Sequence, residues 1–355
     1  VWSSQKDDAC TGAAAQLAAA WNGDRQSQAE AAFADSGVRY AAGVWKRVLP
    51  RIQSYADDWT AHYTEACEAT HVRREQSETI LDARVHCLFQ ARRELDAATS
   101  LLATADRAVV ERAYDVVRSL PSLDRCADVV ALASSVPPPE PAEEKVVAEL
   151  KDELARAKAR STAGKYDEAV ESFLGLVDRS RRIKYEPIRT DIQLSLALAH
   201  DGRGAYAAAE EALQAALKNA IKWEQWEQAE ESASLLVVVT GLRQRKFDAA
   251  LAHAGTAEAF LDKLGNPEVT GLLARRYGVA EAETLPVLGA SLGVFLACAG
   301  LAGPGEAVMV ENPAYEPFRR APEAVGARVV TFPRGGSGGW GLDPAEVLSR
   351  WAPRT

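Results

Sequence analysis

Apolar residues recur at intervals of three and four through the first 136 positions, with charged and polar residues between them. This spacing predicts long amphipathic helices, because such positions share one face of an α-helix. Read with their stop and cap residues, the predicted helices run from about Thr11 to Ala34, from Tyr40 to His71 with an interruption at Pro50, from Ser77 to Ala103, and from Asp106 to Ser119. The connections are short, so neighbouring helices should be antiparallel and residues 1–136 should form a helical bundle.

A second pattern occurs three times between residues 143 and 264. An aromatic residue is followed three positions later by alanine, at Tyr166 and Ala169, Tyr206 and Ala209, and Phe247 and Ala250. The aromatics lie 40 and 41 residues apart, and a fixed period of this size predicts stacked helix pairs that bury a shared apolar seam. The expected pairs are Glu143–Ala163 with Tyr166–Arg181, Pro187–Asp201 with Tyr206–Ala220, and Glu224–Arg243 with Phe247–Leu264. Trp223 and Trp226 are expected to pack between repeats rather than to contact a ligand.

The sequence changes character at two points. Val136-Pro137-Pro138-Pro139-Glu140-Pro141 predicts a stiff linker over residues 137–142. Beyond residue 264, glycine, proline and valine become frequent, and short apolar runs alternate with helical ones, which is typical of α/β architecture. The expected strands are Thr284–Leu288, Ala307–Val310 and Arg328–Phe332, and the expected helices are Ser291–Gly300, Pro317–Val325 and Pro344–Trp351. The fold class is therefore predicted as mainly all-α, with a bundle (1–136), a linker, helical repeats (143–264) and a small incomplete α/β segment (265–355).

Charge and hydropathy reduce the classes of binding partner to be expected. A net charge of −9 argues against a nucleic acid or an anionic membrane surface. Residues 285–302 are uncharged and long enough for a membrane span, but Pro286 and several glycines interrupt them, so a buried strand, turn and helix are expected instead. The chain begins at Val1 without an initiator methionine and is expected to be a fragment or a processed product.

Four of the five cysteines fall in the predicted bundle. Cys10 lies about 36 Å along the first helix from the first turn and Cys67 about 40 Å along the second, at ~1.5 Å per residue. Cys87 and Cys126 reach a similar height on the next two segments. The geometry favours disulfides Cys10–Cys67 and Cys87–Cys126 and an oxidising compartment, the alternative being four buried thiols.

Other candidate chemistry is sparse. Cys67 and His71 stand one helical turn apart, but the spacing supplies no third or fourth ligand, and no metal site is predicted. The remaining histidines show no spacing that indicates catalysis: His62, His86, His200 and His253.

Residues 1–264 resemble the region that follows the kinase domain in myxobacterial serine/threonine protein kinases with tetratricopeptide repeats. The resemblance rests on Thr64–Arg73, Glu75–Glu78, Leu120–Asp128 and the proline-rich linker. In that family a cytoplasmic kinase domain and a membrane span precede this region, so the resemblance implies an extracytoplasmic, periplasmic-side location, or a cytoplasmic one if the cysteines are reduced. The sequence has no glycine-rich phosphate loop, His-Arg-Asp loop or Asp-Phe-Gly triplet. The expected function is a non-catalytic sensor or scaffold that binds a peptide or protein on the concave face of its repeats.

Residues 265–355 resemble the N-terminal part of class I/II, fold-type I pyridoxal-phosphate aminotransferases. Gly265–Glu268, Leu272–Val279, Gly289-Ala290-Ser291 and Glu311–Pro317 carry the resemblance. It implies that Ala290 and Ser291 hold the cofactor phosphate and that Tyr315 stacks on the pyridine ring; ordinary packing is the alternative for Tyr315.

The sequence covers only the first part of the aminotransferase pattern. The Schiff-base lysine, the aspartate partner of the pyridine nitrogen and the carboxylate-binding arginine of that family would all lie beyond Thr355. We therefore expect no tight cofactor binding and no transamination. The alternative is an enzyme in which the aminotransferase part defines the function and a missing part supplies the lysine. The two resemblances meet near Gly265, which predicts a chimera that arose by natural fusion, assembly error or artificial recombination.

Overall fold

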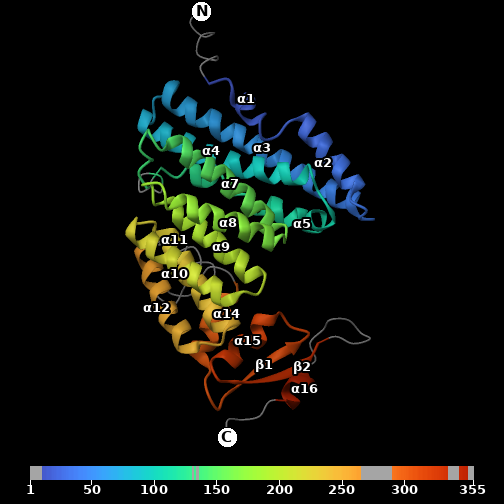
Figure 1. Cartoon of the computed structure of the whole chain (residues 1–355). Coiled ribbons are helices and arrows are strands. Elements are labelled where there is room, and N and C mark those ends of the chain that lie inside the picture. The colour runs from blue at the N-terminus through green and yellow to red at the C-terminus, as the bar shows by residue number, and fades with distance from the viewer. Residues whose placement is uncertain (1–9, 130–131, 133–135, 265–289, 335–343, 351–355) are drawn as a thin grey trace, which may run out of the picture. The chain divides into compact units, whose positions relative to one another are not determined.

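The computed structural model describes residues 10–129, 132, 136–264, 290–334 and 344–350. Over these residues the chain is mainly helical, with one small parallel sheet of two strands, which confirms the helical class expected from the sequence. The chain divides into two compact units, residues 1–203 and residues 204–355 (Figure 1). Within the described ranges, no helix has the length and apolar character that a membrane crossing requires.

The first unit begins with the helices of the bundle. They are α1 (Ala13–Leu17), α2 (Gly23–Asp35), α3 (Ala41–His71), α4 (Glu78–Leu102), α5 (Arg107–Arg118) and the short 3-10 helix η1 (Asp124–Cys126). Three helices begin at capping side chains: the oxygens of Asn22, Ser77 and Asp106 accept backbone N–H groups three residues later, at 2.8, 3.3 and 3.0 Å. Capping of this kind satisfies a donor that the helix itself leaves unpaired.

Two details of the bundle differ from the sequence prediction. The single helix expected over Thr11–Ala34 is wrong, because the chain breaks between α1 and α2. Asn22 makes the break, since its amide donates to the Ala18 carbonyl (2.7 Å) while its oxygen caps α2. The interruption expected at Pro50 is also wrong, because α3 continues through it. Val48 and Ile52 on either side are fully buried, and this burial offsets the hydrogen bond that proline removes.

The core of the bundle is built around Trp59, which is fully buried between α3 and α4. Its indole Nε1–H donates to the Leu88 carbonyl at 2.6 Å, so the one polar atom of the ring is satisfied. Tyr63 stacks on the ring with centroids 5.2 Å apart, and Phe89 packs against both aromatics. The aromatic cluster thus fixes α3 against α4.

Three further helices complete the first unit: α7 (Glu144–Thr162), α8 (Tyr166–Ser180) and α9 (Ile188–Gly202). Helix α7 packs on α4 through small residues, with Ala155 and Ala159 against Ala97. Helix α8 packs against both α7 and α9. Between α7 and α8 the chain reverses at Gly164, whose φ of +81° is readily adopted only by glycine.

The second unit contains α10 (Tyr206–Lys222), α11 (Trp226–Val237), the π-helical turn η2 (Val238–Arg243) and α12 (Phe247–Leu264). These are followed by α14 (Ala290–Leu301), β1 (Ala307–Asn312), α15 (Glu316–Ala324), β2 (Arg328–Pro333) and α16 (Pro344–Ser349). Strands β1 and β2 pair in parallel, with Ala307 opposite Arg328, and α15 connects them and packs on both. These elements confirm the α/β alternation expected after residue 290, whereas the strand expected at Thr284–Leu288 lies outside the described residues.

One apolar cluster joins the helices of the second unit. Phe295 of α14 is its largest fully buried side chain, and the other buried members come from α11, α12, α14 and α15: Val237, Ala250, Leu292, Ala321 and Ala324. Helices α12 and α14 thus share one core within this unit.

Candidate functional site

The structure brings the four bundle cysteines together as two pairs. The Sγ atoms of Cys10 and Cys67 are 2.07 Å apart, and those of Cys87 and Cys126 are 1.98 Å apart. These are disulfide distances, and the pairs are those expected from helix heights in the sequence. The first pair joins the chain before α1 to α3, and the second joins α4 to η1. Cys298 of α14 is a free, half-buried thiol, and burial raises its pKa.

The repeated residues lie where close packing needs them. Ala169, Ala209 and Ala250 are fully buried, while the three aromatics that precede them are half-buried. In the first unit the ring of Tyr166 lies directly over Gly202, so closely that a Cβ at that position would come within 2.4 Å of Cε1. The absence of a side chain at Gly202 therefore makes room for the aromatic of the preceding helix.

Two of the three residues that the aminotransferase resemblance assigns to cofactor binding, Ser291 and Tyr315, are in contact. Ser291, in the first turn of α14, places its Oγ 3.0 Å from the hydroxyl of Tyr315, which precedes α15. The Tyr315 side chain is mainly exposed and lies edge-on to Phe318. Ala290 is the first residue of α14 and so lies in the same turn as Ser291. Gly265–Glu268, Leu272–Val279 and Gly289, which carried part of the resemblance, lie outside the described residues.

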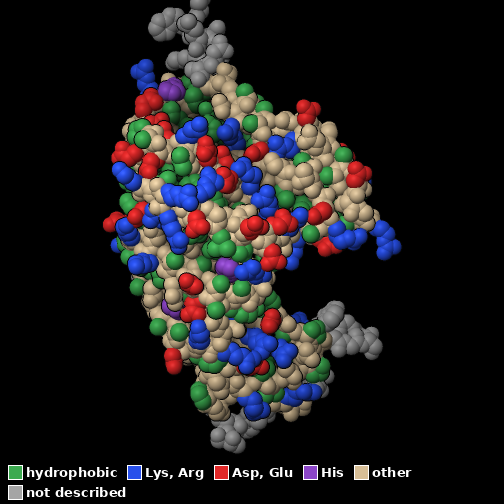
Figure 2. All heavy atoms as spheres, in the orientation of Figure 1, with side chains coloured by type: hydrophobic (Ala, Val, Ile, Leu, Met, Phe, Trp, Pro, Cys, Tyr) green, Lys and Arg blue, Asp and Glu red, His purple; other side chains and the backbone are tan. Residues whose placement is uncertain are grey.

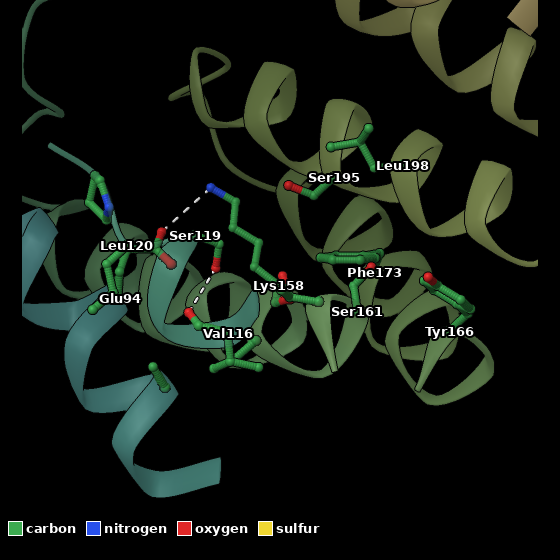
Figure 3. A pocket seen from close by; sticks show the side chains of 14 residues that line it. Glu94, Val116, Ser119, Leu120, Lys158, Ser161, Tyr166, Phe173, Ser195 and Leu198 are labelled. Carbon is green, nitrogen blue, oxygen red and sulfur yellow. Dashed lines mark hydrogen bonds and ion pairs between the residues drawn. The ribbon is translucent and has the colours of Figure 1, made fainter. Parts of the chain in front are cut away.

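A groove of about 410 Å³ opens in the first unit between α7–α9 and the ends of α4 and α5 (Figure 3). We call it the α7–α9 groove. Its size lies within the range of ligand pockets in proteins. Serine and threonine hydroxyls line it together with apolar side chains, and its residues are Glu94, Ala98, Val116, Ser119, Leu120, Pro121, Lys158, Ala159, Ser161, Thr162, Tyr166, Phe173, Ser195 and Leu198.

One ion pair crosses the groove at its bundle side. Lys158 of α7 reaches toward Glu94 of α4, with Nζ 3.5 Å from Oε1 (Figure 3). Nearby, Tyr55 donates from its hydroxyl to the Pro121 carbonyl at 3.0 Å. Burial, together with the charge of Glu94, raises the pKa of Tyr55, so the phenol stays protonated and remains a donor. These contacts fix the wall that α4 and the chain after α5 contribute.

The opposite wall comes from α8 and α9. Phe173 is fully buried and forms the apolar floor of the groove, whereas Leu198 is 44% exposed and faces the opening of the groove. Ser195 lies one turn before Leu198 on the same face of α9 (Figure 3). The wall thus presents an exposed apolar side chain beside the largely buried hydroxyl of Ser195, a group that can both donate and accept hydrogen bonds.

A second ion pair ties α8 to the bundle near this groove. Lys165 Nζ lies 2.7 Å from Asp106 Oδ2, at the residue that caps α5. The hydrogen bond from Lys165, together with the backbone N–H of Val109, lowers the pKa of Asp106, and the same contact raises the pKa of Lys165. The residue that precedes α8 is therefore anchored to the start of α5.

No protein-family model, curated protein or solved structure matches the chain. Across the part of the chain that the structure describes, no group of three or more His, Cys, Asp or Glu is arranged to hold a metal ion.

Of the groove residues, Tyr166 was expected from the sequence only as a repeat-packing residue, and Glu94, Lys158, Ser195 and Leu198 were not expected to form a site. Ser195 and Leu198 were within reach of sequence reasoning, because their spacing of three places both on one face of a predicted repeat helix. Glu94 and Lys158 were not, since 64 residues separate them and no local pattern links the two.

Proposed function

We propose that this chain is a non-catalytic scaffold or sensor region that binds a peptide segment of a protein partner. The helix pairs are tetratricopeptide-like repeats in this proposal, and the α7–α9 groove is the binding site. The observation that carries it is the groove itself, where the hydroxyl groups of Ser161 and Ser195 lie beside apolar side chains. The hydroxyls of Ser119 and Thr162 donate to the Val116 and Lys158 carbonyls and can still accept hydrogen bonds. An extended peptide needs both polar and apolar groups, because its backbone N–H and C=O groups require partners while its side chains gain from burial.

The proposal also concerns location. Two disulfide-distance pairs are typical of proteins outside the reducing cytoplasm, and they support an extracytoplasmic region like that of the kinases the sequence resembles. The kinase-associated origin is proposed from the resemblance of Thr64–Arg73, Glu75–Glu78, Leu120–Asp128 and the proline-rich linker to the same family.

Selection from a random peptide library displayed on phage tests the function, with oxidised full-length chain as the target. We expect enriched peptides to bind the parent and L174E chains alike and the L198E chain at least about tenfold more weakly. Leu198 (44% exposed) lines the groove, whereas Leu174 (50% exposed) lies on α8 outside the groove lining, so the two variants add the same charge at similar exposure.

Circular dichroism of both variants controls for folding. The proposal is wrong if no peptide is enriched, or if the enriched peptides bind L198E as tightly as L174E.

A second candidate function follows from the contact between Ser291 and Tyr315. The first turn of α14 offers backbone N–H groups and a hydroxyl, an arrangement suited to a phosphate. We propose that any residual binding of pyridoxal phosphate takes place at Ala290, Ser291 and Tyr315, without covalent attachment to a lysine at this site.

Fluorescence titration with pyridoxal phosphate tests the second candidate. Weak saturable binding that S291A reduces and S349A leaves unchanged is expected, and borohydride treatment should trap no single modified lysine. Strong trapping at one site would instead support the enzyme alternative.

A further inference from the structure

A cavity in the second unit carries three arginines. It has a volume of about 240 Å³ and is lined by Tyr206, Leu242, Arg243, Arg245, Glu316, Pro317 and Arg320. Its walls come from the start of α10, the end of η2 and the first turns of α15. On the face shown in Figure 2, basic side chains gather over α15, with acidic side chains at their edge.

Neighbouring groups hold the guanidinium groups in place. Arg320 lies 3.3 Å from Glu323 and 3.4 Å from Glu316 on its own helix, and Arg245 lies 3.7 Å from Glu323. The guanidinium of Arg243 sits over the ring of Tyr206, 5.8 Å from its centroid.

The backbone before α12 places two of the arginines on one cavity. In a regular helix, residues two apart do not face each other, yet Arg243 and Arg245 both line this site. The π-helical turn ends at Arg243, and Arg245 then adopts a left-handed conformation with φ of 61°. Between them, the side chain of Gln244 donates to the Tyr206 carbonyl (3.1 Å) and to Glu210 (2.9 Å), which fixes the turn against α10.

Arg245 occupies a position where glycine would be under less strain. The corresponding residue before α8 is Gly164, with φ of 81°, and before α10 it is Gly204, with φ of 80°. A residue with a Cβ loses stability in this conformation, whereas glycine adopts it freely. Arg245 therefore holds a strained left-handed conformation, as Glu224 does before α11, and in this conformation its side chain lines the cavity.

We propose that this cavity binds the carboxylate or phosphate group of a small organic anion, whose apolar body lies against Tyr206, Leu242 and Pro317. Guanidinium groups match both oxyanions in geometry and charge, because their N–H donors form a planar fork. The apolar wall beside them favours an anion attached to a hydrophobic body over a bare inorganic ion.

Because Arg245 is in the left-handed conformation, replacing it with glycine should remove the guanidinium without weakening the fold. R245G should raise the melting temperature of the second unit by about 2–4 °C, because glycine relieves the backbone strain. E224G is the matched control: Glu224, before α11, is also left-handed, with φ of 55°, and does not line the cavity.

Isothermal titration of the full chain with benzoate and with phenyl phosphate at low salt tests the proposal. We expect one or both to bind saturably, E224G to bind like the parent, and R245G and R243Q each to raise Kd about tenfold. The tighter of the two probes identifies the head group. Acetate and inorganic phosphate, which lack the apolar body, should bind more weakly.

Three results would overturn the proposal: no saturable binding of either probe, unchanged affinity in R245G, or a bare ion (acetate or inorganic phosphate) binding as tightly as the bound probe that shares its head group. Because R245G is expected to be at least as stable as the parent, a loss of binding in this variant cannot be attributed to unfolding.

Discussion

The contact between Tyr166 and Gly202 provides a sharp test of how the helices of the first unit pack. Gly202 is the last residue of α9, and replacing a helical glycine by alanine ordinarily stabilises a protein by about 1 kcal/mol. At this position the new Cβ would lie 2.4, 2.6 and 2.9 Å from the Cε1, Cζ and Cδ1 atoms of Tyr166. Carbon atoms in favourable contact are about 3.5–4 Å apart, so the ring or the helix must move.

The size of the effect follows from these distances. Overpacking of this kind costs about 1–3 kcal/mol, and a ring at the end of a side chain can yield, so we take about 2 kcal/mol. Subtracting the usual gain from alanine leaves a net loss of about 1 kcal/mol for G202A. For a unit of this size that loss lowers the melting temperature by about 2–4 °C, which calorimetry resolves.

Two further variants separate packing from helix propensity. Gly175 lies in the middle of α8, and a Cβ at that position would have no atom within 4 Å outside its chain neighbours and the nearby backbone of its own helix. G175A should therefore raise the melting temperature by about 2–4 °C. In a Y166A background the clash is gone, and G202A should become stabilising as well. If G202A stabilises the parent chain as G175A does, the ring of Tyr166 does not pack on α9 and the account of this seam is wrong.

Three other outcomes are expected. Denatured, unreduced protein should show one reactive thiol, that of Cys298, and four or five reactive thiols would contradict the pairing. Reduction should lower the free energy of unfolding by up to about 4 kcal/mol per disulfide, measured by urea denaturation with and without reductant. Glu230 is buried and burial raises its pKa, so E230Q should raise the melting temperature at neutral pH, and the gain should vanish as acidification protonates the parent carboxyl in both states; an equal gain at all pH values would contradict this. The pKa of Asp106 is lowered by Lys165, so D106N should lose up to about 1 kcal/mol above the ordinary carboxyl pKa and less below it, in urea titrations across pH; a pH-independent difference would contradict the ion-pair explanation.

The helices could be predicted from the sequence because their signals are local. The bounds of α8, α10 and α12 follow from apolar spacing and from the residue two positions before each aromatic, where the chain reverses. The cysteine pairing was predicted by comparing positions along antiparallel neighbours at a constant helix rise, and it holds although the first of those helices is broken at Asn22.

The break at Asn22 was predictable in principle, since Asn22-Gly23 is a turn signal that the apolar spacing around it obscured. The π-helical turn at Val238–Arg243 was not, because its form depends on packing against α10, α12 and α15. The α7–α9 groove and the arginine-lined cavity were missed for the same physical reason. Each is assembled from elements far apart in the chain, and periodicity describes only which face of one helix is buried.

The second disulfide has a consequence for the groove as well as for stability. Cys87 lies seven residues, or two helical turns, before Glu94 on α4, so both side chains occupy one face of that helix. Its partner, Cys126, follows the loop that supplies Leu120 and Pro121 to the groove lining. The carbonyl of Cys126 also accepts from Arg84 at 3.3 Å, and Tyr55 holds the Pro121 carbonyl. The loop is therefore fixed at both ends to the bundle, close to the Lys158–Glu94 pair. Covalent and hydrogen bonds thus set this wall in advance, so the peptide binding proposed for the groove would have less conformational entropy to remove.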